Sequence, residues 1–290
     1  MMKANHLFKR SLFAALLLGL IQSGAPAVGQ SIRLAKHWET PAVLLVPESV
    51  LYDKANNVLY TANINGQPAG KDGNGSIGRV SLDGKVLNAT WVSEGLDAPK
   101  GMGLHKGLLY VADLTKVSVI DVKTGKIVRN IEAPGAGMLN DITIDAQGVI
   151  YVSDSAKPKV YRITNNQAEV WLEKAELQKP NGLLAHQDRL YLVDMTTGIF
   201  YEVDKKTKAL RKIAEGLAGG DGIVPYGQDF ILSNWNGEVN LVSAQGKVEK
   251  LLDTKEAKIN AADLEYIPGK NLLLVPTFFV NTITAYSIKK

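Results

Sequence analysis

The sequence predicts an all-β fold, a six-bladed β-propeller whose ring is closed by an N-terminal strand. The first observation is a short phrase that returns about every 40 residues, each time with a different polar residue at the same place. From Lys100 onward these polar residues are 40, 41, 40 and 42 positions apart. Periods of this size are typical of arrays of similar supersecondary units. The copies are Pro47–Val50, Pro99–Met102, Leu139–Ile142, Pro180–Leu183, Gly220–Ile223 and a weaker sixth, Ala262–Glu265.

The second observation is that each unit contains four strand signals. In the unit that starts at Asn140, short alternating or apolar runs are separated by polar turns, the pattern of antiparallel strands. Its four runs are Ile142–Ile144, Val149–Val152, Lys159–Ile163 and Ala168–Leu172. Four strands at this period form one propeller blade, so six copies of the phrase predict six blades.

The third observation concerns the two ends of the folded chain. The last unit supplies only three strands before the sequence ends, whereas Ser31–Trp38 is a strand-like segment with no place in any unit. We expect this segment to complete the final blade, because closing the ring removes an open sheet edge. No helix of convincing length is predicted after the leader, although Lys174–Gln178 could form a single turn.

The first 27 residues resemble a secretory signal peptide. A basic start with Lys3, Lys9 and Arg10 precedes an apolar run over residues 11–21, and Ala25-Pro26-Ala27 offers a small-residue cleavage site. Residues 28–290 are then one propeller domain, expected to be periplasmic or secreted. The alternative is an uncleaved anchor, but the apolar run is short for a span of about 20 residues.

Charge and composition exclude several classes of function. The chain has 33 Lys and Arg against 29 Asp and Glu, and three of the positive residues lie in the leader. The remaining chain is nearly neutral, so we expect no nucleic-acid partner and, after cleavage, no membrane partner. The absence of cysteine excludes disulfides, a catalytic thiol and thiolate metal sites.

Propeller geometry turns the repeated phrase into a candidate site. The odd residue of each copy opens the innermost strand of its blade, so these residues should surround one mouth of the central channel. They are Glu48, Lys100, Asn140, Asn181, Asp221 and, from the weak copy, Asp263. Carboxylate and amide oxygens are the ligands that Ca²⁺ prefers, and they are costly to bury unsatisfied. A bound cation is expected, and a water-filled polar channel lined by ordinary turn residues is the alternative.

A second set of polar residues follows the second strand of five units. Its members are Asn63, Asp113, Asp154, Asp194 and Asn234. Most are expected to stabilise turns and blade contacts, and Asp154 and Asp194 are the candidates for supporting the ring residues from behind. The glycine-rich stretch 64–76 either covers the site or is a surface loop, and Trp235 either walls the pocket or packs.

The ring phrases resemble those of the gluconolactonase family, which includes regucalcin (senescence marker protein). The resemblance implies a six-bladed propeller with one divalent metal in the channel. The family's Glu-Gly-Pro, Pro-Asn-Gly and Pro-Asp-Gly ligands correspond to Glu48, Asn181 and Asp221. Its Asn-Asp phrase corresponds to Asn140, and an Asn at that position binds calcium in the related paraoxonase-like propellers. Ser49-Val50, Gly220 and Lys100 depart from the family pattern.

These observations favour a metal-dependent hydrolase that acts on a small-molecule substrate, a lactone or small ester. Asp221 would bind the metal and serve as general base, while Asn140 and Lys100 would orient substrate oxygens. Ca²⁺ is the expected cation, with Zn²⁺, Mn²⁺ or Mg²⁺ as alternatives. No Gly-x-Ser-x-Gly phrase supports a serine nucleophile. The alternative class is a non-catalytic propeller that binds a ligand or protein at the channel mouth. The sequence does not indicate an oligomeric state.

Overall fold

The computed structural model describes Met1 and residues 32–290. The predicted signal peptide, residues 1–27, and the predicted start of the domain at residue 28 lie outside the described residues, apart from Met1. Within the described part, no helix has both the length and the apolar character that a membrane span requires.

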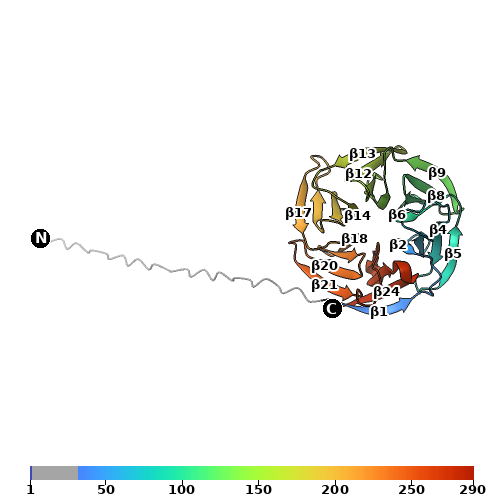
Figure 1. Cartoon of the computed structure of the whole chain (residues 1–290). Coiled ribbons are helices and arrows are strands. Elements are labelled where there is room, and N and C mark those ends of the chain that lie inside the picture. The colour runs from blue at the N-terminus through green and yellow to red at the C-terminus, as the bar shows by residue number, and fades with distance from the viewer. Residues whose placement is uncertain (2–31) are drawn as a thin grey trace. The chain divides into compact units, whose positions relative to one another are not determined.

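Residues 32–290 form six four-stranded antiparallel sheets arranged in a ring, as predicted (Figure 1). Blade 1 contains β2 (Pro47–Asp53), β3 (Val58–Asn63), β4 (Ser76–Val80) and β5 (Val86–Val92). Blade 2 contains β6 (Pro99–His105), β7 (Leu108–Asp113), β8 (Lys116–Asp121) and β9 (Lys126–Glu132). Blade 3 contains β10 (Leu139–Ile144), β11 (Ile150–Asp154), β12 (Lys159–Thr164) and β13 (Gln167–Glu173).

The second half of the ring repeats this order. Blade 4 contains β14 (Pro180–His186), β15 (Arg189–Asp194), β16 (Phe200–Val203) and β17 (Leu210–Ala214). Blade 5 contains β18 (Gly220–Tyr226), β19 (Asp229–Asn234), β20 (Glu238–Val242) and β21 (Val248–Asp253). Blade 6 contains β22 (Glu265–Ile267), β23 (Leu272–Pro276), β24 (Ile283–Lys289) and β1 (Arg33–Glu39).

Strand β1 closes the ring, which confirms the prediction for the N-terminal segment. It pairs antiparallel with β24, from Arg33 opposite Lys289 to Glu39 opposite Thr284. In Figure 1 the blue β1 therefore lies beside the red β24. The pairing gives blade 6 its fourth strand and leaves no blade incomplete.

In blades 1 to 5 the repeated phrase opens the innermost strand with a break in the ladder. In blades 2 to 5 the first residue of the phrase pairs with the second strand, and pairing resumes only three residues later, as between Pro99 and Met102. Such a bulge leaves residues unpaired and re-aims their side chains. Here it frees the polar residue of the phrase to face the channel. Proline fits the first position because a strand can begin with a residue that lacks an N–H.

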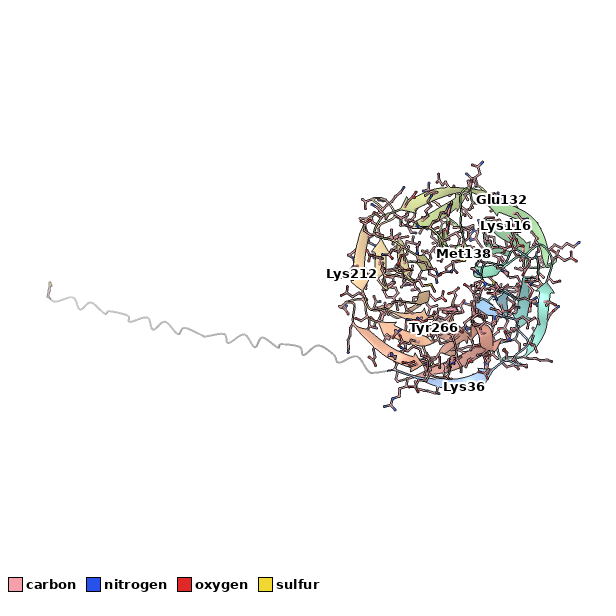
Figure 2. All side chains as sticks on the ribbon, viewed as in Figure 1. Lys36, Lys116, Glu132, Met138, Lys212 and Tyr266 are labelled. Carbon is pink, nitrogen blue, oxygen red and sulfur yellow. The ribbon has the colours of Figure 1, made fainter. Side chains whose placement is uncertain are left out.

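The hydrophobic core lies between blades. Within residues 32–290, six apolar clusters each join two neighbouring blades, for example Val117 of β8 with Leu139 of β10 and Ile150 of β11. A seventh cluster gathers at one mouth of the ring from loops of several blades. Charged residues such as Lys36 and Lys212 lie on the outer edge, whereas Met138 lies near the centre (Figure 2).

Helical structure in the described part is limited to two 3-10 turns, η1 (Pro268–Lys270) and η2 (Phe278–Val280). Lys174–Gln178 makes one turn, closed by the Leu177 N–H and the Lys174 carbonyl at 3.1 Å. Both results agree with the expectation of a protein with almost no helix.

Candidate metal and substrate site

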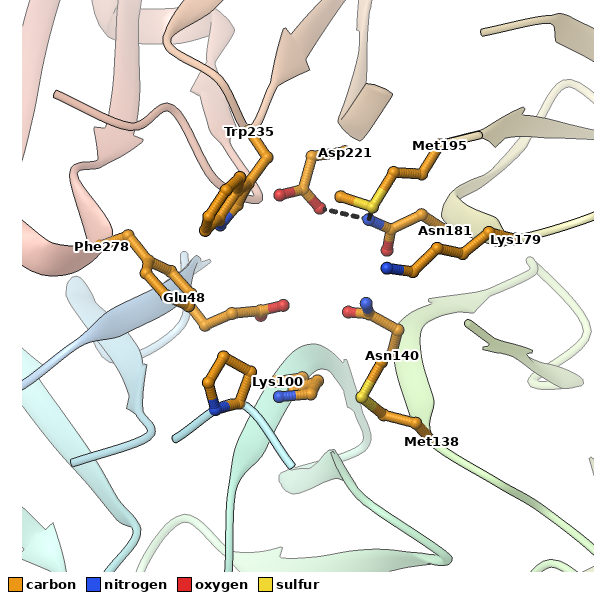
Figure 3. A pocket seen from close by; sticks show the side chains of 11 residues that line it. Glu48, Lys100, Met138, Asn140, Lys179, Asn181, Met195, Asp221, Trp235 and Phe278 are labelled. Atoms are coloured by element: carbon orange, nitrogen blue, oxygen red, sulfur yellow. Dashed lines mark hydrogen bonds between the residues drawn. The ribbon is translucent and has the colours of Figure 1, made fainter. Parts of the chain in front are cut away.

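Five of the six predicted ring residues line one cavity of about 230 Å³ at the mouth of the channel (Figure 3). Each comes from the phrase that opens the first strand of a different blade, and each is at most 8% exposed. They are Glu48, Lys100, Asn140, Asn181 and Asp221. The repeat therefore brings together side chains that are up to 173 positions apart in the sequence.

Asp263 is not part of this ring, so the predicted register of the sixth phrase was wrong by one residue. Asp263 bridges to Ser49, the residue after Glu48, and its N–H donates to the Glu48 carbonyl at 3.0 Å. Ala262 takes the ring position and is buried in the apolar cluster at the mouth. The sixth blade thus contributes no polar group to the cavity, because its phrase has alanine where the other copies have a polar residue.

Three buried polar atoms of the ring have no hydrogen-bond partner within the described protein. They are Glu48 Oε2, Asn181 Oδ1 and Lys100 Nζ. An unpaired buried carboxylate oxygen or ammonium group is costly, and native proteins keep few of them. Glu48 and Asn181 point their polar ends into the cavity in Figure 3. These three atoms are therefore available for hydrogen bonds or coordination within the cavity.

The two ring amides are held by specific partners. Asn140 donates its side-chain N–H to the Ser155 hydroxyl at 3.0 Å, and Ser155 in turn donates to the Pro180 carbonyl at 3.0 Å. Asn181 donates to Asp221 Oδ1 at 3.0 Å. Each amide therefore uses its nitrogen for a protein contact, which leaves its oxygen for the cavity. Ser155 was missed in the sequence because a serine after a strand is an ordinary turn residue.

Burial dominates the electrostatics of the ring. It raises the pKa of Asp221 to about 7, against the opposing effects of the Asn181 hydrogen bond and the positive charges of Lys100 and Lys179. Burial and the negative charge of Asp221 raise the pKa of Glu48 well above its usual value. Burial lowers the pKa of Lys100, although Glu48 acts in the opposite direction. A cation bound near the two carboxylates would lower their pKa values, because it favours their ionised forms.

Lys179 is a cavity residue that the sequence reasoning missed. It immediately precedes Pro180, and its side chain runs along the cavity wall toward Asn140 (Figure 3). Lys100 and Lys179 line the cavity together with the two carboxylates, Glu48 and Asp221. The two lysines and two carboxylates of the lining have a net charge near zero when all four groups are ionised.

The walls above the polar floor are apolar. Trp235 fulfils both roles considered for it, because it lines the cavity and packs edge-on against Phe278 with ring centroids 5.5 Å apart. Pro68 brings the glycine-rich stretch 64–76 to the wall, so this insertion does border the site. The apolar lining residues are Pro68, Met138, Met195, Trp235 and Phe278. Phe278 could not be placed from the sequence because it lies in η2, a 3-10 turn between β23 and β24 that the repeat does not predict.

Asp154 and Asp194 do not reach the cavity and instead bind backbone. Asp154 accepts hydrogen bonds from the Gly137 and Met138 N–H groups at 2.7 and 2.9 Å. Asp194 accepts four, two from Gln178 and Lys179 at 2.8 Å and two from the turn that follows it. Both aspartates thus fix the segments that lead into the strands bearing Asn140 and Asn181.

The donor set of the cavity suits a hard cation better than a soft one. No group of three or more His, Cys, Asp or Glu side chains with the geometry of a metal site occurs in residues 32–290. The cavity instead offers two carboxylates and two carboxamides, all oxygen donors. Glu48 Oε2 and Asn181 Oδ1 are free of protein partners, and Lys100 Nζ occupies neither of them. The residues present therefore fit a Ca²⁺-type ion completed by water or substrate oxygens.

None of the described histidines lines this cavity. His105 and His186 end β6 and β14, at the opposite ends of the strands that begin with the ring phrases. His186 borders a separate surface depression with Gly227 and Asp229. Histidine-based catalysis in the cavity is therefore unsupported by the described residues.

Solved structures with the same fold include two lyases and a protein complex. Virginiamycin B lyase from Staphylococcus aureus, a catalytically inactive His-to-Ala variant solved with quinupristin, matches with a TM-score of 0.65 and 14% identity over 89% of this chain and 99% of that one. Streptogramin B lyase matches with 0.66 and 9% over 89% and 98%. A chain of a nidogen/laminin complex matches with 0.63 and 19% over 76% and 84%.

At these identities the structural matches show the fold alone. No family model matches the chain, and no curated protein matches it in sequence. The chain is therefore a six-bladed β-propeller whose channel mouth holds a cavity with a polar floor and apolar walls. Its resemblance to the gluconolactonase family stays a prediction, based on the ring phrases.

Proposed function

We propose that the protein is a hydrolase that uses one divalent cation, Ca²⁺ in the first place, to cleave a lactone or small ester in the channel-mouth cavity. The observation that carries this proposal is the pair of buried, unpartnered oxygens, Glu48 Oε2 and Asn181 Oδ1, in a cavity that Asp221 and Asn140 also line. These four residues would hold the cation. When bound, it would polarise the substrate carbonyl and acidify a water molecule.

The chain's own residues supply the remaining functions. Asp221 is the proposed general base, since it lines the cavity and its Oδ1 is positioned by the Asn181 N–H at 3.0 Å. Lys100 and Asn140 are proposed to orient substrate oxygens. Lys179 adds a second positive charge for the carboxylate that ester hydrolysis produces. The apolar walls exclude bulk water and strengthen these polar interactions.

A non-catalytic role is the second candidate, and one observation favours it. Lys100 and Lys179 together balance Glu48 and Asp221, so the cavity can approach neutrality through its own side chains. Neighbours of this fold include lyases and a chain of a protein complex, so the fold does not decide between catalysis and binding. A lyase activity has less support. The virginiamycin B lyase variant in which a histidine is replaced by alanine is catalytically inactive, and no described histidine lines the cavity of this protein.

The test is hydrolysis by the purified protein loaded in turn with Ca²⁺, Zn²⁺, Mn²⁺ and Mg²⁺. We expect turnover of a lactone or aryl ester with at least one of these ions, abolished by chelation. Failure with every ion on sugar lactones, aliphatic lactones and aryl esters would contradict the hydrolase. Ligand binding that persists in Asp221→Ala, without turnover in the wild type, would support the binding protein.

A further inference from the structure

Exposed hydrophobic side chains in residues 32–290 fall into two groups. Four are isolated on the outermost strands of separate blades, where single exposed apolar residues are ordinary: Leu87, Val128, Val170 and Val248. The other four lie in two loops, one before β2 and one at η2. This second group, called the apolar rim below, is Val43, Leu45, Phe279 and Val280, which are 37–55% exposed.

The two loops of the apolar rim are joined to each other and to the cavity. The Leu44 N–H donates to the Asn281 carbonyl at 3.3 Å, and the Val46 N–H donates to Asn281 Oδ1 at 2.9 Å. Phe279 contacts the cavity wall directly, because its ring lies edge-on to Phe278 at 4.8 Å between centroids and to Trp235 at 6.2 Å. Apolar surface therefore continues from the wall of the cavity onto Phe279, and hydrogen bonds to Asn281 hold the loop that carries Leu45 beside the η2 loop.

The backbone around this surface is held in a conformation that bulky residues avoid. Among the described residues, the apolar side chains at positive φ are Val46 (54°), Leu114 (55°) and Phe278 (52°). All three belong to the apolar cluster at the mouth or pack against it. A left-handed backbone conformation is rare for bulky apolar residues, and where it occurs it is often at a ligand-binding site. Phe278, at one of these positions, is buried, whereas the next residue, Phe279, is exposed.

The size of the cavity explains why a ligand would reach the rim. At about 230 Å³ it is smaller than the roughly 300–1,000 Å³ typical of sites for drug-sized ligands. It can hold a lactone ring or a short ester, but a larger substituent on the same molecule must extend out of the cavity through its mouth. The side of the mouth formed by Trp235, Phe278 and Phe279 is apolar, so an apolar substituent is the one that this exit favours.

We propose that the substrate carries an apolar substituent that lies over Phe279 and Leu45 on the apolar rim while its ester group is in the cavity. This inference rests on the proposed function and narrows it, since it selects apolar lactones or esters over polyhydroxylated sugar lactones. It identifies Phe279 and Leu45 as residues that determine specificity.

The first test compares kcat/KM for δ-valerolactone and δ-decalactone, which differ by a pentyl group. Burial of about half of each added methylene predicts a roughly 30-fold preference for δ-decalactone. In Phe279→Ser/Leu45→Ser this ratio should fall about tenfold. Val128→Ser, an equally exposed residue on β9, should leave the ratio unchanged. A wild-type ratio near one, or an equal loss in Val128→Ser, would overturn the inference.

The second test does not depend on turnover, so it separates this inference from the hydrolase itself. Calorimetry with the matching lactams, which resist hydrolysis, should show the pentyl lactam binding about 30-fold more tightly than the unsubstituted one, and this preference should fall about tenfold in Phe279→Ser/Leu45→Ser. Equal affinities would reject the rim as a substrate surface even if lactones are cleaved. A dimer in sedimentation that this variant dissociates would assign the rim to a second copy of the chain.

Discussion

Two rings of similar polar residues lie at the ends of neighbouring strands, and the carboxylates of the two rings differ in how their oxygens are satisfied. The outer ring follows the second strands, and its aspartates accept backbone hydrogen bonds, as Asp113 does from the Asp97 and Ala98 N–H groups. The inner ring opens the first strands, and there Glu48, Asn181 and Lys100 each leave a buried polar atom without a protein partner.

The difference teaches that residue type alone does not mark a functional group. Both rings contain buried aspartate and asparagine. An aspartate whose oxygens bind backbone N–H groups, such as Asp194, is committed to the fold. A carboxylate with an unpartnered oxygen facing a cavity, such as Glu48, is available to a ligand. We therefore expect inner-ring variants to lose function and outer-ring variants to lose stability.

The largest effect should come from Asp221→Asn. If Asp221 is the general base, its replacement should lower kcat/KM about 10³-fold, which is about 4 kcal/mol of transition-state stabilisation. The melting temperature should change little, because the asparagine keeps the shape of the side chain. Steady-state kinetics and thermal unfolding of the same preparation measure both. Activity within tenfold of the wild type would remove Asp221 from the chemistry.

Asp194→Ala should give the next largest effect, on stability. It leaves four backbone N–H groups without their acceptor, and we expect a loss of about 4 kcal/mol in the free energy of unfolding. The matched variant, Asn181→Ala, removes one hydrogen bond to Asp221 and should cost about 1 kcal/mol. Urea denaturation compares the two. Equal losses would erase the distinction between the rings.

Glu265 extends the comparison because its carboxyl group accepts backbone hydrogen bonds, as in the outer ring, and has a raised pKa, as in the inner ring. Its carboxyl accepts the Tyr52 N–H at 3.0 Å and the Tyr266 N–H at 2.9 Å, yet burial raises its pKa to about 7. A raised folded-state pKa gives stability that is present below pH 4.5, the ordinary value, and is lost as the pH rises through 7.

The expected consequence is a pH-dependent difference between wild type and Glu265→Gln. Between pH 4.5 and 7.5 the wild type should lose about 3 kcal/mol more of its free energy of unfolding than the variant does. Urea denaturation across this range measures the slope, which is independent of any constant cost of the substitution. Parallel profiles would show that Glu265 titrates normally.

Most of the fold could be predicted because short local sequence patterns determine where its strands begin and how many each blade contains. The phrases at Pro99 and Pro180 set the starts of β6 and β14, and the missing strand of the last unit required the segment at Arg33. Ring geometry then placed Glu48 and Asp221 at one cavity.

The remaining parts of the site depend on features that no repeat encodes. The sixth phrase has two alanines and no proline or glycine before Asp263, so its register could not be set from the pattern. Lys179 precedes its phrase and enters the cavity only through the direction of its long side chain. Phe278 lies in the 3-10 turn η2, and its positive φ of 52° is not indicated by the sequence.

The most direct test of the central claim is calorimetric titration of the chelator-treated protein with Ca²⁺. We predict one ion per chain, binding weakened at least 100-fold in Glu48→Gln, and unchanged binding in Glu169→Gln, which removes the same charge from an exposed ion pair on β13. Absence of binding at millimolar Ca²⁺, or equal affinity in Glu48→Gln and the wild type, would contradict the account of the inner ring as a cation site.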